Sequence, residues 1–171
     1  MRRTLVAVAL AALVATAGCA AFGGGDTDTD AVPTDDVVEP SDPAANATGV
    51  NQSIRLSVGD SVAGSEWTSL SVEYPRENFT VESAQHENVS LGVDTDGDGE
   101  LDEQFNETHI SGVNNNAYSF TVELDTGYTL ASGDVVVVEY PAVNNPAEPG
   151  NYTVSVTLND EQTTNATVIV E

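Results

Sequence analysis

The sequence has no lysine, and its four cationic side chains are Arg2, Arg3, Arg55 and Arg76, against 28 acidic residues. Recognition of nucleic-acid phosphates requires a basic face, so the formal net charge of -24 predicts no nucleic-acid partner. Repulsion among the carboxylates destabilises a compact state in dilute buffer, whereas molar salt shortens the Debye length to about 3 Å. The composition is therefore typical of a protein adapted to high salt.

Cysteine occurs once, at Cys19, so the chain cannot form an internal disulfide. The two histidines, His86 and His109, show no zinc-ligand spacing, and no serine lies in a G-x-S-x-G sequence. We therefore expect no catalytic residues, no enzyme activity and no cofactor other than the calcium ion discussed below.

Long apolar runs are absent apart from the stretch between Leu5 and Thr16, which follows Arg2 and Arg3. This stretch is short for a bilayer core of about 30 Å. A basic start, a short apolar run and small residues before a processing site are typical of a cleaved leader. Residues 1–18 are therefore predicted to be a signal peptide.

The paired arginines resemble a twin-arginine export signal, and Thr16-Ala17-Gly18-Cys19 resembles the lipobox of lipoproteins in halophilic archaea. This resemblance implies cleavage before Cys19 and a lipid on its sulfur. It also implies a protein held at the outer face of the cytoplasmic membrane. The alternative is a secreted protein that loses Cys19 with its leader.

Two further regions follow the leader. Residues 19–49 are rich in Gly, Asp, Thr, Ala and Pro, which predicts a flexible acidic linker. Residues 50–171 carry apolar side chains at every second position, as at Ile54, Leu56 and Val58, and turn residues separate about eight or nine such strands. The run Val135–Val138 predicts a central strand buried on both faces. We predict an all-β fold, an antiparallel immunoglobulin-like β-sandwich.

The most distinctive motif is Asp94-Thr95-Asp96-Gly97-Asp98-Gly99-Glu100-Leu101-Asp102, which matches D-x-D-x-D-G-x-x-D. It resembles the calcium loops of thrombospondin type three repeats, and calcium prefers six to eight oxygen ligands. The resemblance implies a structural calcium held by Asp94, Asp96, Asp98, the backbone carbonyl of Glu100, and Asp102. Phe105 stands where an EF-hand has its closing glutamate. The alternative is an acidic turn that only reverses the chain.

Seven Asn-x-Ser/Thr sequences are present, and on an exported chain they are N-glycan acceptors. They begin at Asn46, Asn51, Asn78, Asn88, Asn106, Asn151 and Asn165. The same spacing also arises simply because residues two apart in a strand share a face. Aromatic side chains at strand positions, such as Trp67 and Tyr140, are expected in the core rather than in a carbohydrate-binding platform.

The segment from Tyr128 to Leu158 resembles a strand-loop-strand unit of extracellular immunoglobulin-like domains in prokaryotic surface proteins. Such a resemblance concerns the fold and not an activity. We predict a non-catalytic cell-surface lipoprotein, a structural, adhesive or partner-binding module that is calcium-stabilised and N-glycosylated. Its partners would be the membrane, through the lipid, and a surface protein or a glycan. The alternative is an accessory lipoprotein that presents a solute or an ion to a membrane transporter or enzyme.

Overall fold

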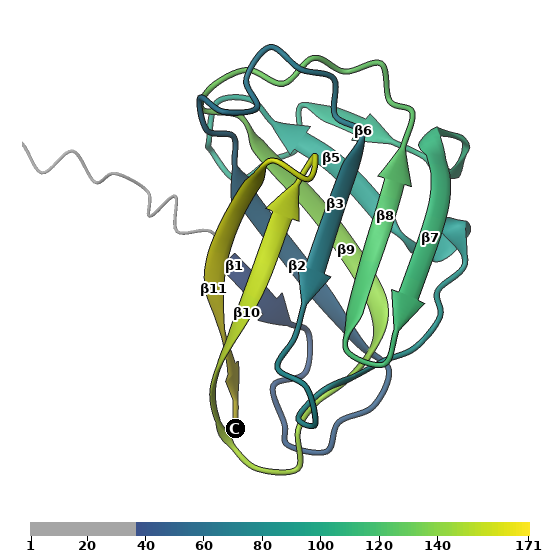
Figure 1. Ribbon diagram of the computed structural model, residues 1–171, viewed down its shortest axis with the longest axis vertical. Helices are drawn as coiled ribbons and strands as arrows, with labels where there is room; N and C mark the ends of the chain where they lie inside the picture. The colour runs from purple at the N-terminus through teal and green to yellow at the C-terminus, as the bar shows by residue number, and fades with distance from the viewer. Residues whose placement is uncertain (1–36) are drawn as a thin grey trace, which may run out of the picture. The chain divides into compact units, whose positions relative to one another are not determined.

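Alternating apolar and polar residues form the strands of two antiparallel sheets that pack face to face (Figure 1). The computed structural model describes residues 37–171. One sheet has the order β1-β2-β9-β5-β6, with β4 pairing with β9. Its strands are β1 (Val37–Pro40), β2 (Val50–Ser57), β4 (Thr80–Val81), β5 (Ser90–Asp94), β6 (Glu103–Phe105) and β9 (Val135–Asn144).

The second sheet has the order β11-β10-β3-β8-β7. Its strands are β3 (Ser69–Glu73), β7 (Ile110–Asn116), β8 (Ser119–Leu124), β10 (Gly150–Leu158) and β11 (Gln162–Val170). Two short 3-10 helices, η1 (His86–Asn88) and η2 (Glu107–His109), flank the β5–β6 hairpin in the sequence. The predicted all-β, immunoglobulin-like sandwich is confirmed.

The core lies between the sheets and is built mainly of valine, leucine and aromatic side chains. Val136 and Val138 are fully buried, and Val135 and Val137 are 6% and 7% exposed, because β9 lies between β2 and β5 and both of its faces are covered. The expected central strand is therefore confirmed. Phe120 stacks on Tyr140 of β9 with ring centroids 3.9 Å apart.

The aromatic residues divide between the core and its margin. Trp67, Tyr74 and Tyr140 are buried, as expected, although only Tyr140 lies within a strand. Tyr128 and Tyr152 are half-buried and pack against the core.

The folded region begins earlier than the sequence indicates. Residues 37–49 fall in the predicted linker, yet β1 pairs with β2, and Val38 is 1% exposed. The following segment is tied to the end of the chain, because the backbone of Glu171 hydrogen-bonds to Pro43 and Ala45. Tertiary pairing thus orders a segment that is too short to show strand periodicity. The predicted leader, Cys19 and residues 20–36 lie outside the described residues.

Residues 37–171 form eleven strands, more than the expected number, because β1, β6 and β7 have no regular alternation in the sequence. Within residues 37–171, no helix is long and apolar enough to cross a membrane.

Candidate functional site

The predicted calcium loop connects β5 to β6. Asp94 is the last residue of β5 and pairs with Val135 of β9, so the start of the loop is anchored to the centre of its sheet. Gly97 and Gly99 have φ angles of 75° and 95°. Side chains with a Cβ rarely adopt this left-handed region, so the two Asp-Gly pairs allow the tight course of the loop.

Asp94 is the best-satisfied carboxylate of the loop. It is fully buried, and its Oδ2 accepts hydrogen bonds from Arg55 at 2.7 Å and from the Gly99 backbone N–H at 2.9 Å. Its Oδ1 accepts from the Gly97 N–H at 2.7 Å. The Arg55–Asp94 ion pair is the only salt bridge within residues 37–171. Charge-assisted bonds of this kind are stronger than neutral ones, so they hold the loop on the sheet.

The other carboxylates close the loop on itself. Asp102 Oδ2 accepts hydrogen bonds from the hydroxyl and the backbone N–H of Thr95, at 2.6 and 2.7 Å, and these bonds lower the pKa of Asp102. Asp96 accepts from the Asp98 N–H, and Asp98 from the Glu100 N–H. The loop is therefore ordered by its own side chains and by Arg55.

Three of the predicted ligands come together. Asp94, Asp96 and Asp102 each offer a carboxylate oxygen, and these oxygens lie within 4.8 Å of one another. The carboxylates of Asp98 and Glu100 are not in this group, although a backbone carbonyl was the expected ligand at Glu100. An all-oxygen, acidic donor set fits calcium in type. Because Arg55 bonds to Asp94, the cluster already has one cationic partner, which the sequence did not indicate.

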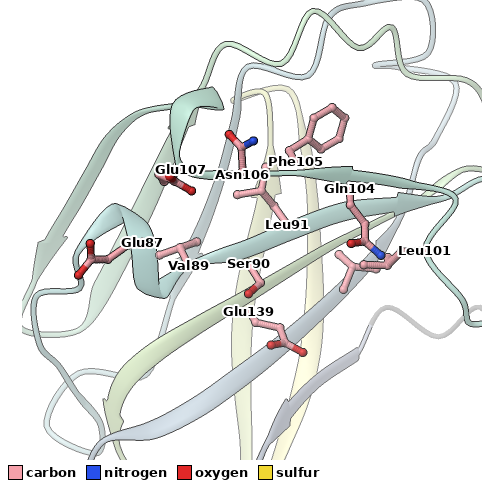
Figure 2. Close-up of a pocket in the computed structure, with 11 residues that line it drawn as sticks. Glu87, Val89, Ser90, Leu91, Leu101, Gln104, Phe105, Asn106, Glu107 and Glu139 are labelled. Atoms are coloured by element: carbon pink, nitrogen blue, oxygen red, sulfur yellow. The ribbon is translucent and has the colours of Figure 1, made fainter.

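The β5–β6 hairpin also borders a cavity of about 400 Å³ on the outer side of its sheet (Figure 2). Its lining includes the apolar residues Leu101 and Val137, and three glutamates, Glu87, Glu107 and Glu139, surround it. A cavity surrounded by carboxylates favours a cationic occupant over an anionic one.

Phe105, at the end of β6, connects the hairpin to the core. Its ring makes edge contacts with Trp67, Tyr128 and His109, with centroid distances of 5.9, 6.1 and 5.5 Å. Trp67 is fully buried and is the single tryptophan of the chain. Any change in the hairpin that moves Phe105 therefore alters the surroundings of one fluorescent side chain.

A second buried carboxylate lies near this aromatic group. Tyr128 donates its hydroxyl hydrogen bond to Asp134 at 2.8 Å, and Asp134 is 4% exposed. Burial and the bond to Asp134 raise the pKa of Tyr128 to about 12. The sequence showed only a Ser-Gly-Asp turn at this position, so this tertiary contact was not predicted.

The histidines and the sequons fall on the surface of the sandwich. His86 lies in η1, and His109 lies in η2, where it contacts Asn106 and Phe105. Six of the seven predicted acceptor asparagines are exposed, and Asn51 is half-buried and bonds to Glu139. Their glycosylation stays a prediction.

No protein-family model and no curated protein matches the chain. Solved structures that resemble it include the bacterial hydrophobin BslA, with 15% identity, a TM-score of 0.42, and coverage of 79% of this chain and 93% of BslA. An immunoglobulin-like protein from Nocardia farcinica shows 14% identity, a TM-score of 0.38, and coverage of 75% and 80%. The N-terminal domain of a Streptococcus gordonii adhesin shows 12% identity, a TM-score of 0.47, and coverage of 79% and 32%. At such low identity, these similarities concern the fold alone.

Proposed function

We propose that this chain is a non-catalytic, lipid-anchored module of the cell surface, with a structural, adhesive or partner-binding role, whose β5–β6 loop binds a stabilising calcium ion. The proposal rests chiefly on one observation: the carboxylate oxygens of Asp94, Asp96 and Asp102 lie within 4.8 Å of one another at the end of a sheet. The export and lipid-attachment signals at Arg2, Arg3 and Cys19 support the location.

Electrostatics explains why a cation would stabilise this loop. Asp96 and Asp102 are exposed and Asp94 is buried, so folding brings three carboxylates together with Arg55 as their one described ion-pair partner. Like charges at this separation repel one another, and a divalent ion removes that cost. A ligand that binds only the folded state raises stability by RT ln(1 + [L]/Kd).

Thermal unfolding tests the calcium site directly. The full chain is heated in molar KCl with calcium or with a chelator, and Trp67 fluorescence follows the transition. Calcium is expected to raise the Tm of the natural protein. It should leave the Tm of an Asp96→Asn, Asp102→Asn double variant unchanged. Molar KCl screens general repulsion, so a remaining shift reports specific binding.

A matched control loses the same two charges elsewhere. Asp160→Asn, Glu161→Gln lies in the turn between β10 and β11, where Asp160 has a φ of 57° that asparagine tolerates. The control should keep the calcium response. Identical transitions in all three proteins, with and without calcium, would leave the loop as an acidic turn.

The surface location has its own test. Mass spectrometry of the membrane-extracted protein should show a lipid on an N-terminal Cys19 and glycans on some of the exposed sequons. A Cys19→Ser variant should move the protein from the membrane fraction to the medium. Recovery of an unmodified Cys19 protein from the medium would contradict the anchor.

A second candidate function is the accessory lipoprotein that presents a solute or an ion to a membrane transporter or enzyme. The cavity beside β5 and β6, with its rim of Glu87, Glu107 and Glu139, is the observation that favours it. Co-purification of a membrane complex that is lost in a Glu107→Gln, Glu139→Gln variant would support this function.

A further inference from the structure

The four outer strands of the two sheets differ in how they are protected against pairing with another chain. β1 has four residues and includes Glu39 and Pro40, and β6 has three residues and includes Glu103. β7 contains an irregularity between Ile110 and Gly112. Short length, charge, proline and bulges are the features that keep sheet edges from pairing.

β11 has none of these features. It runs for nine residues, QTTNATVIV, without a charge or a proline, and its register with β10 is continuous from Gln162 to Val170. Thr, Val and Ile favour strands. β7, the other outer strand of this sheet, is also uncharged, but it is shorter and its register with β8 is interrupted. Figure 1 shows β11 at the margin of its sheet.

The backbone direction of β11 follows from its two ends. The Glu171 N–H bonds to Pro43 and not to β10, so the backbone of Glu171 faces away from β10. The Asn159 N–H bonds to Ser69 beside β3, so the odd-numbered residues of β10 face β3 and the even-numbered ones face β11. Because alternate residues of a strand face opposite sides, the N–H and C=O groups of Thr163, Asn165, Thr167 and Ile169 point away from the sheet.

The outer face of the same strand carries an exposed apolar side chain. Ile169 is 56% exposed and is the only large hydrophobic residue of residues 37–171 that is exposed. It lies at a groove of about 400 Å³ between β11 and the neighbouring strand β1, lined also by Val37, Glu39, Pro40 and Glu171. An unpaired edge next to an exposed apolar residue is a pairing surface by the usual criteria.

We propose that β11 pairs antiparallel with β11 of a second copy of this chain, so that two five-stranded sheets become one continuous sheet. A two-fold axis through Ala166 sets Thr163 opposite Ile169 and Asn165 opposite Thr167. The four outward-facing pairs then form about eight hydrogen bonds, two per pair. The register also keeps buried residues on the core face and exposed residues on the outer face in both copies.

The charge distribution favours β11 as the place where two copies of this chain can meet. Two molecules of net charge -24 repel one another over most of their surfaces, whereas the two β11 strands carry no charge of their own. Only Glu161 and Glu171, just beyond the ends of the strand, lie opposite each other in this register, and molar salt screens their repulsion. Residues 20–36, which precede β1 in the sequence, are rich in Gly and Asp and contain Pro33, a composition that disfavours strands. Side chains stand perpendicular to the sheet, so a glycan on Asn165 would leave the backbone edge accessible.

Two measurements on the full chain in detergent and molar KCl test the proposal. Sedimentation equilibrium follows the protein mass from about 1 μM to about 1 mM, a range that suits a small interface. Amide hydrogen exchange follows Thr163, Asn165, Thr167 and Ile169. The mass should roughly double with concentration, and these four amides should become protected at the same concentrations. The amides of Thr164, Ala166 and Val168, which face β10, should be protected throughout.

Thr167→Pro removes an outward N–H that the β10 ladder does not use, and Thr167→Val is its matched control because it keeps that N–H. The proline variant should stay a single copy with the amides of Thr164 and Val168 still protected, and the valine variant should pair. If the proline variant does not fold, a Thr163→Asp, Ile169→Asp double variant replaces it. The proposed register sets these two positions opposite each other, so the introduced carboxylates should repel and prevent pairing.

Three results would overturn the proposal. The mass could stay that of one copy over the whole range. The proline or double aspartate variant could still pair, which would place the interface elsewhere. The four outward amides could be protected at every concentration, which would mean that another segment of the same chain covers the edge. None of these results depends on calcium binding by the β5–β6 loop.

Discussion

The centre of the first sheet and the loop at its end are ordered by different forces. Val135 to Val138 of β9 are buried on both faces among apolar side chains. The loop from Asp94 to Asp102 begins beside this strand, because Asp94 pairs with Val135. It is ordered by hydrogen bonds from backbone N–H groups to its carboxylates and by the ion pair with Arg55. Apolar burial responds little to salt or pH, whereas a carboxylate network responds to both. The β5–β6 hairpin thus joins a core whose stability depends little on ions to a loop whose stability depends on them.

The largest effect is expected in the core. Phe120→Ala removes a ring that is 1% exposed and stacked on Tyr140 of β9. Cavities of this kind lower the free energy of unfolding by about 3–5 kcal/mol. Urea unfolding in molar KCl should show the same loss with calcium and with a chelator. A loss that depends on calcium would contradict the separation of core and loop.

Asp94→Asn should have the next largest effect, because it removes the buried charge that Arg55 and two glycine N–H groups contact. We expect the free energy of unfolding to fall by about 1–3 kcal/mol. Arg55→Gln should cost at least as much, because it leaves the fully buried Asp94 carboxylate without its cationic partner. A double-mutant cycle of the two changes, measured by urea unfolding, gives the coupling energy. A coupling near zero would show that the ion pair does not hold the loop.

Gly99→Ala tests the backbone of the loop. Its φ of 95° is unfavourable for alanine, and the added Cβ would meet no atom within 4 Å, so the cost comes from the backbone alone. The free energy of unfolding should fall by about 1–2 kcal/mol. Gly150→Ala is the control, because a Cβ there meets Tyr152 at an ordinary distance of 3.6 Å. Equal effects at both positions would show that the left-handed turn is not required.

The smallest effect concerns the titration of Asp102. Hydrogen bonds from the hydroxyl and the N–H of Thr95 lower the pKa of Asp102 from 3.8. The ionised carboxylate therefore stabilises the folded state fully when the pH is above 3.8, the pKa in the unfolded chain. The contribution is lost as the pH falls through the lower folded pKa. Thr95→Val removes the hydroxyl donor and should raise the pKa of Asp102 toward 3.8, as NMR titration would show. An unchanged pKa would mean that the backbone N–H alone sets it.

Some structural features could be read from local patterns. The alternation at Ile54 and Leu56 and the valine run of β9 predicted strands and their burial, because side-chain direction in a strand depends only on position. The Asp-Gly loop was also located, since turn formation is a property of neighbouring residues. Contacts between distant residues could not be read in this way. Arg55 and Asp94 are 39 residues apart, and their meeting depends on β2 and β5 flanking the same strand.

The candidate site shows the same limit. The motif named Asp94, Asp96 and Asp102, which the structure brings together, but spacing alone did not separate them from the carboxylates of Asp98 and Glu100. The sequence also did not indicate that β11 would be an outer strand, because its pattern of Thr and Val would suit an inner strand equally well.

By itself, the sequence determined the fold class, the buried face of each regular strand and the position of the acidic loop, because side-chain period and turn chemistry act between near neighbours. Only the tertiary structure decided that β1 belongs to the sandwich, that Arg55 neutralises Asp94, that Phe105 contacts Trp67, and that an uncharged strand ends the second sheet. Strand order is set by packing between segments far apart in the chain, which no local pattern encodes.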